Sequence, residues 1–234
     1  MLMTQTASQN RLLDALPPAE YDLLAADLEP VTLDLGLILY EPPDPFPYVY
    51  FPTTAIISFL AELADGSGAE VGLVGSEGLA GLEVILGANQ ATKVATVQGA
   101  GDALRLRPDK LRAAFQQGGV LQQHLLHLTH AMMMQISVSV LCVIRHNIER
   151  RLARWLLMYH DRLGRDEFYI THEFMANMLG IRRAGVSEVA KQLQQAGLVD
   201  YDRGDFRILD RAGLEQQACE CYQTVKTEFD QLYK

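Results

Sequence analysis

Residues that could bind a metal ion or react with an oxidant occur in two short segments. His124, His127 and His130 are spaced three apart, which places them on one face of a helix. Cys219 and Cys221 are separated by one residue near the C-terminus. Neither spacing supplies a complete ligand set, so we expect no metal ligands, and haem is disfavoured. The alternative is a redox-, metal- or haem-sensing regulator that uses the histidine stripe or the three cysteines, Cys142, Cys219 and Cys221.

The sequence contains no catalytic motif. A serine nucleophile elbow, a P-loop and a paired-histidine helix motif are all missing, and we therefore expect that the protein is not an enzyme. Three cysteines in 234 residues exclude a disulfide scaffold and fit a reducing compartment. The first residues lack a basic region followed by a long apolar core, so the expected location is the cytoplasm.

The segment from Tyr169 to Leu209 is the most informative part of the chain. Thr171 is a suitable N-cap for a helix from His172 to Leu179, which Gly180 ends with a tight turn. A second helix is expected from about Arg182 to Ala196, closed by Gly197, and a hairpin from Leu198 to Leu209 follows. This order predicts a winged helix-turn-helix, with the alternative of a helical hairpin that has only a structural role.

The second of these helices carries basic and hydroxyl side chains at its start. Such a helix can enter the major groove, where its first turn reaches base edges and its cations meet phosphates. Arg183 suits guanine O6 and N7, and Glu188 could accept a hydrogen bond from cytosine N4. The predicted DNA-contacting residues are Thr171, Arg182, Arg183, Ser187, Glu188, Lys191 and Arg203.

The charge distribution agrees with this placement. The whole chain has a formal net charge of −9. Residues 1–144 hold 6 basic and 15 acidic residues, whereas residues 145–211 hold 12 basic and 10 acidic ones. Phosphate binding responds to the local field within a screening length of about 8–10 Å. The expected partner is double-stranded DNA, and the acidic front part is not expected to bind nucleic acid.

Short β-like runs separated by turn residues precede this segment. They predict an antiparallel sandwich or roll that follows two short helices, Asn10–Leu16 and Pro18–Leu28. The expected strands are Val31–Leu33, Leu37–Tyr40, Tyr48–Phe51, Ala55–Leu63, Ala69–Leu73, Thr92–Gln98 and Ala103–Leu106. The expected class is α+β, with a β-roll domain (1–117), a dimerisation helix (118–146), a winged helix-turn-helix (147–211) and a C-terminal helical extension (212–234).

A long helix is expected after Pro108 and the Gly118-Gly119 break. Its positions Leu121, Leu125, Leu128, Met132, Gln135, Ser139 and Cys142 follow the 4-3 spacing of a two-stranded coiled coil, which predicts a homodimer. A second stripe comprises Leu126, Met133, Ile136, Val140 and Val143. We expect no membrane span, because histidines and glutamines are spread through the apolar run. Cys142 is expected to pack as a small apolar residue.

The order of β-roll, long helix and winged helix-turn-helix resembles the Crp/Fnr superfamily of bacterial transcription regulators, whose β-roll is a cyclic-nucleotide-binding domain. The resemblance is strongest at Arg151–Leu157 and Thr171–Val199, and in the β-domain at Leu37–Glu41 and Val71–Gly87. It implies a homodimer on a palindromic site, with half-sites one helical turn apart. It also implies an effector in the β-roll and RNA polymerase as a partner.

The chain departs from the cyclic AMP receptors of this superfamily. The positions of the glutamate and arginine that hold the ribose and cyclic phosphate fall on Gly81 and Ala91. Losing a charge-assisted phosphate contact costs several kcal/mol, so cyclic AMP is disfavoured. The residues expected around the divergent effector pocket are Gly81, Leu82, Glu83, Thr92, Ile136 and Ser137.

The sequence also departs from the oxygen-sensing branch of the superfamily and from its usual recognition-helix residues. The oxygen-sensing branch holds an iron–sulfur cluster with N-terminal cysteines, and since no cysteine precedes Cys142 we exclude this cluster. Ala184 and Glu188 stand where the superfamily often has a glutamate and a second arginine, so the target should differ from the TGTGA half-site. A ligand-binding scaffold that does not bind DNA stays the alternative class.

Overall fold

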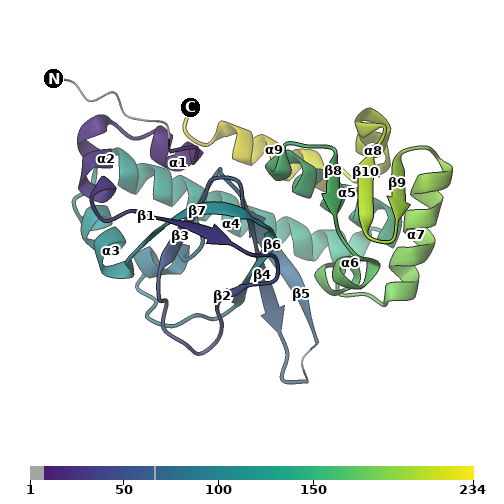
Figure 1. The fold of residues 1–234 in the computed structure, drawn as a ribbon, viewed down its shortest axis with the longest axis horizontal. Coiled ribbons are helices and arrows are strands. Elements are labelled where there is room, and N and C mark those ends of the chain that lie inside the picture. The colour runs from purple at the N-terminus through teal and green to yellow at the C-terminus, as the bar shows by residue number, and fades with distance from the viewer. Residues whose placement is uncertain (1–7, 66) are drawn as a thin grey trace. The chain divides into compact units, whose positions relative to one another are not determined.

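The computed structural model describes residues 8–65 and 67–234, and it divides into two compact units (Figure 1). Unit 1 comprises the chain up to Phe59, Leu73–Met133 and Phe229–Lys234. Unit 2 comprises Leu60–Gly72 and Met134–Glu228. Each unit is described by itself.

The β-rich part of the chain forms two sheets. The first has the antiparallel order β1 (Glu29–Leu33), β7 (Gly101–Leu106) and β3 (Val49–Pro52). The second has the order β2 (Ile38–Tyr40), β6 (Val94–Gly99), β4 (Ile56–Glu62) and β5 (Gly68–Val74). Every strand predicted in this part is present, with bounds within two residues, because alternation and turn residues determine short strands well.

Short helices accompany the sheets of unit 1. These are α1 (Arg11–Asp14), α2 (Pro18–Ala25), the 3₁₀ turn η1 (Leu82–Leu86) and α3 (Pro108–Gln116). Glu20 of α2 accepts hydrogen bonds from the backbone N–H groups of Val120 and Leu121, at 3.0 and 2.7 Å. A carboxylate therefore satisfies the first orphan donors of the long helix α4 (Gly119–Arg145).

The two apolar stripes of α4 differ in exposure. The expected coiled-coil seam is turned into the chain's own fold: Leu121, Leu125, Leu128, Gln135 and Cys142 are all at most 1% exposed. The second stripe is open, with Leu126, Met133, Val140 and Val143 between 48% and 64% exposed. The prediction that the first stripe is the face offered to a partner is therefore wrong, because the fold of one chain already covers that stripe.

Within the described residues α4 is the one helix that is long and apolar enough to cross a membrane by length and composition. Its apolar window has a mean hydropathy of 1.5, and 22% of it is buried inside the chain. Glutamines and histidines are spread among the apolar residues of this helix. A bilayer would have to desolvate each of them, which is costly.

After the end of α4, unit 2 continues with α5 (Ile148–Leu163). Asn147 accepts a hydrogen bond from the backbone N–H of Arg150 as the N-cap, and Gly164 ends the helix at a φ of 69°. The remaining elements are β8 (Glu167–Tyr169), α6 (His172–Leu179), α7 (Arg183–Gln195), β9 (Val199–Asp202), β10 (Asp205–Ile208), α8 (Arg211–Gln217) and α9 (Cys221–Gln231).

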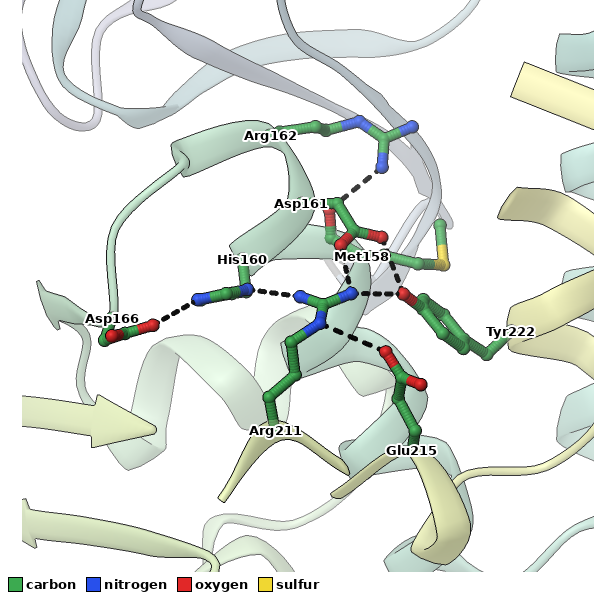
Figure 2. Close-up of polar contacts among 8 residues, drawn as sticks. All are labelled: Met158, His160, Asp161, Arg162, Asp166, Arg211, Glu215 and Tyr222. Carbon is green, nitrogen blue, oxygen red and sulfur yellow. Dashed lines mark hydrogen bonds and ion pairs between the residues drawn. The ribbon is translucent and has the colours of Figure 1, made fainter. Parts of the chain in front are cut away.

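A polar network attaches α8 and α9 to α5. The guanidinium of Arg211 donates to Asp161 at 2.6 Å and to the hydroxyl of Tyr222 at 2.7 Å (Figure 2). Tyr222 in turn donates to the second carboxylate oxygen of Asp161 at 2.9 Å. Glu215 and His160 also contact Arg211, so one guanidinium connects three helices. The C-terminal extension is thereby packed on α5.

Candidate nucleic-acid interface

The first helix of the predicted helix-turn-helix is bounded by two local interactions. The Thr171 hydroxyl accepts a hydrogen bond from the backbone N–H of Phe174 at 3.1 Å, so Thr171 is the N-cap of α6. Gly180 ends the helix at a φ of 62°, a left-handed conformation that glycine adopts without a Cβ penalty. Both ends of α6 lie where the sequence predicts them.

The two helices pack through the predicted residues. Met175, Ala176 and Leu179 of α6 are buried, and so are the facing apolar side chains of α7, Val186, Val189, Ala190 and Leu193. The small alanines let the helices approach closely. Because this face is covered, the opposite face of α7 and its N-terminal turn are turned to solvent.

The N-terminal edge of α7 carries exposed cations. Arg182 occupies the N-cap position, Arg183 begins the helix, and Lys191 lies two turns further along; all three are exposed. Arg183 Nε lies 3.9 Å from Glu173 Oε2 in an ion pair, and both side chains are about two thirds exposed. Such an exposed pair contributes little free energy, roughly 0–1 kcal/mol. The guanidinium is therefore available to a partner.

Two further predicted residues of α7 already have partners within the chain. Glu188 accepts a hydrogen bond from Gln192 at 3.2 Å. The Ser187 hydroxyl lies 2.9 Å from His172 Nδ1. Either residue would have to exchange or share this contact to meet DNA.

His172 is a residue of this surface that sequence reasoning missed. Its ring stacks on Tyr201 of β9 with 4.2 Å between centroids and 17° between planes. Burial lowers its pKa, and the nearby charge of Arg183 lowers it further. His172 thus connects α6, α7 and β9 as a neutral ring. A histidine directly after a helix cap was the only signal in the sequence.

The predicted wing is present and is larger than expected. β8, β10 and β9 form an antiparallel three-stranded sheet in that order, beside α7 (Figure 1). Sequence analysis missed β8, a strand of three residues. The hairpin between β9 and β10 turns at Arg203 and Gly204, with φ of 50° and 106°. Positive φ at both turn residues suits a two-residue hairpin, and it places exposed Arg203 at the tip.

Comparison with known proteins matches this arrangement to a known type of domain. Residues 150–217 match the model of the Crp-like helix-turn-helix domain. The chain has the fold of the Crp/Fnr regulators. FixK2 from Bradyrhizobium japonicum superposes with a TM-score of 0.71 at 17% identity, covering 82% of this chain and 98% of its own. A Crp/Fnr-family regulator from Eubacterium rectale gives 0.68 at 18% identity, covering 90% and 99%.

A third structure of the same fold is that of a protein described as responsive to a cyclic dinucleotide. It is the c-di-GMP-responsive global regulator CLP of Xanthomonas campestris, with a TM-score of 0.63 at 14% identity, covering 82% of this chain and 99% of its own. No curated protein matches this sequence. The superfamily resemblance found in the sequence is thus confirmed for the fold and for the helix-turn-helix domain.

The residues that the sequence predicts around an effector pocket belong to both units. Gly81, Leu82, Glu83 and Thr92 belong to unit 1, and Ile136 and Ser137 of α4 belong to unit 2. Gly81 has a φ of 93°, and a Cβ there would lie 2.8 Å from Val49 Cγ1. Glu83 pairs with Lys93, whose ammonium lies 5.7 Å from the centre of the Phe59 ring. A glutamate at position 81 would therefore need a different backbone conformation. The charges of Glu83 and Lys93 neutralise each other.

The histidines of the predicted stripe and the three cysteines lie in different surroundings. His124 is half-buried edge-on against Tyr233, whereas His127 and His130 are exposed on α4. Cys142, Cys219 and Cys221 are all buried and lie together with His146. A hydrogen bond with Cys219 lowers the pKa of Cys142 to about 5, with further contributions from His146 and Arg154. The same contact and burial raise the pKa of Cys219.

Proposed function

We propose that the protein is a sequence-specific, DNA-binding transcription regulator that acts in the cytoplasm as a homodimer. The observation that carries the proposal is the N-terminal edge of α7. It presents Arg182 and Arg183 to solvent beside a packed, capped α6, on a domain that matches the Crp-like helix-turn-helix. A double-stranded DNA major groove accepts a helix of this kind.

The proposed contacts divide into base readout and positioning. Arg183 reads a guanine through O6 and N7, and Glu188 reads the neighbouring cytosine or repels the backbone. Arg182, Lys191 and the wing residue Arg203 meet phosphates, and the hydroxyls of Thr171 and Ser187 help to position the duplex. With Ala184 and Glu188 in place of the superfamily's usual glutamate and arginine, the half-site differs from TGTGA.

The homodimer is proposed to form along the open stripe of α4. Leu126, Met133 and Val140 are spaced seven apart, and Val143 lies three residues beyond the last of them, which is coiled-coil spacing. All four side chains are about half exposed or more in the single chain. A two-fold dimer of this kind presents two copies of α7 to half-sites one helical turn apart. RNA polymerase is the proposed protein partner.

The controlling signal is proposed to be a ligand or a redox change other than cyclic AMP. The absence of a carboxylate at position 81 and of a cation at position 91 supports this part, as does the internal Glu83–Lys93 pair. An enzymatic activity is not proposed. The alternative function is a scaffold that binds a ligand but no DNA, and DNA binding distinguishes the two.

The test is a titration of the full-length protein against DNA fragments from upstream of its own gene and against scrambled DNA. We expect binding at least about 1000-fold tighter to a specific fragment than to scrambled DNA, and affinity that falls as salt rises. Equal affinity for both DNAs, or none at low salt, would rule out the proposed function.

A further inference from the structure

Four side chains with metal-binding atoms come together at the C-terminal end of α4. Cys142 and His146 are four residues apart and share one face at the end of this helix, and Cys219 lies between α8 and α9. Cys221 begins α9. All four residues belong to unit 2, so their arrangement is internal to one compact body. The contacts bridge more than 70 residues of sequence.

The distances fit one tetrahedral ion. Cys142 Sγ lies 3.5 Å from Cys219 Sγ, and Cys221 Sγ lies 3.7 Å from His146 Nδ1. All four ligand atoms lie within 4.8 Å of one another. Zinc–sulfur bonds of about 2.3 Å in a tetrahedron put ligand atoms roughly 3.8 Å apart. A disulfide needs about 2.05 Å between sulfurs, and an iron–sulfur cluster spreads its thiolates over several irons.

The surroundings of the ligands resemble those of a metal centre. His146 uses Nδ1 toward the cluster, and its Nε2 lies 3.4 Å from a carboxylate oxygen of Glu220. A carboxylate that holds the second ring nitrogen is the usual partner of a metal-binding histidine, because it fixes the tautomer and orientation. Glu220 belongs to the same segment that supplies Cys219 and Cys221.

Charge in the site also favours a cation with thiolate ligands. The three cysteines are at most 4% exposed, so three bare thiolates would be costly there. A divalent cation leaves one net negative charge on the group. Arg154, which is 9% exposed and acts electrostatically on Cys142, supplies a compensating positive charge. Within the described residues, Arg154 Nε is buried without a hydrogen-bond partner.

The ligand loop is held in place independently of the cluster. Tyr222, next to Cys221, is fixed by Asp161 and Arg211, and Arg211 begins α8 (Figure 2). On the far side of the loop, Gln217 donates to Glu149 of α5. The backbone on both sides of Cys219 and Cys221 is therefore anchored to α5, which lowers the entropy cost of assembling the ligands.

We propose that Cys142, His146, Cys219 and Cys221 bind one zinc ion in a closed Cys₃His site. Each thiol that binds loses its proton to solvent, and the imidazole binds neutral. Four protein ligands leave no open position, so the ion is structural. It fastens the C-terminal extension to the end of α4, directly before the helix α5 that opens the DNA-binding domain. This proposal departs from the sequence-based expectation of no metal ligands.

The test is metal analysis of the full-length protein purified in reductant without added metal. We expect about one zinc per chain, and about one Co²⁺ after exchange, with the visible and thiolate-to-cobalt absorption of a tetrahedral site. Thiol titration should find three thiols that react fully only after a chelator is added. Iron in place of zinc, a Cys142–Cys219 disulfide, or three free thiols with no zinc after incubation with Zn²⁺ would each overturn the proposal.

Matched variants separate ligation from folding. Cys221→Ser and His146→Gln should each reduce bound zinc at least about tenfold, because each removes one of four ligands. Cys221→His should keep the ion, since imidazole is also a zinc ligand. His127→Gln, on the exposed face of the same helix, should keep one zinc per chain. If Cys221→Ser does not fold, the cobalt spectrum of the wild-type protein decides; zinc content unchanged in both ligand variants would contradict the site.

Discussion

The charged side chains near η1 have partners within the chain, whereas those at the start of α7 are exposed to solvent. In the β-domain, Glu83 is paired with Lys93, and Arg112 donates to the backbone carbonyls of Val84 and Ala88. On α7, Arg182 and Arg183 are exposed and have at most a weak partner. A charge that the chain satisfies by itself contributes to folding, whereas a charge left open at a helix edge is available for binding another molecule.

The two faces of α4 show the same contrast for apolar side chains. One stripe is covered by the chain itself, and the other exposes Leu126, Met133, Val140 and Val143.

The largest effect is expected from Val140→Glu on the open stripe. In a two-fold dimer the two introduced carboxylates would face each other, so the protein should become monomeric and lose DNA affinity on the order of 1000-fold. Sedimentation equilibrium and DNA titration measure the two changes. Met133→Leu, which keeps the surface apolar, should stay dimeric; a dimeric Val140→Glu variant would show that the stripe is not the interface.

The next effect concerns base reading by α7. Arg183→Ala should cost about 1–3 kcal/mol of binding free energy and relax the preference at one base position. Lys191→Ala should instead weaken binding on all sequences alike and reduce the salt slope by about 1. Titrations on matched and single-substituted sites separate the two. If Arg183→Ala weakened binding equally on all sequences, its base-reading role would be wrong.

A charge that the fold already uses should affect stability. Arg211→Met removes the donor shared by Asp161 and Tyr222, and should lower the free energy of unfolding by about 1–3 kcal/mol. Arg107→Met, which breaks an ion pair that is more than half exposed on both sides, should leave it nearly unchanged. Chemical denaturation compares the two variants. Equal losses would show that the network of Figure 2 contributes no more than a surface pair.

A smaller effect is expected from pH. Burial lowers the pKa of His172, so the unfolded chain binds a proton more readily than the folded one. Its contribution to stability is present above the ordinary histidine pKa of about 6.5 and is lost as pH falls below that value. His172→Gln should flatten the loss of stability between about pH 7 and pH 5. His127→Gln should keep the wild-type loss, and an unchanged slope in His172→Gln would contradict the assignment.

No effect is expected from cyclic AMP. A ligand at a hundredfold excess over its Kd would stabilise the protein by about 2.7 kcal/mol, which a thermal melt detects easily. We expect no shift of the melting temperature with millimolar cyclic AMP, because the chain has no carboxylate at position 81 and no cation at position 91. Calorimetry that shows micromolar affinity would contradict this.

The sequence predicted elements that depend on local signals. Thr171 is a cap and Gly180 a helix end; the effect of each is confined to one turn, and each lies where it was expected. The sequence-based choice of the partner face of α4 was wrong, since both apolar stripes have helical spacing. Only the packing of the other elements decides between them.

The cysteine cluster shows the same limit more sharply. Cys142 and His146 have the four-residue spacing of paired helix ligands, and Cys219 and Cys221 form a close pair, so partial signals were present. The two pairs are brought together by α5, α8 and the Arg211 network, which no local spacing encodes. The histidines with the most regular spacing, His124, His127 and His130, are not part of the cluster.

The central claim is that α7 reads a specific DNA sequence, and selection from a random double-stranded library tests it most directly. The wild-type protein should enrich a two-fold symmetric site with half-sites one helical turn apart, about 10 base pairs between centres. Parallel selection with Arg183→Ala should lose one G·C preference in each half-site. Enrichment of no sequence by the wild-type protein, or the same site from both proteins, would contradict the account.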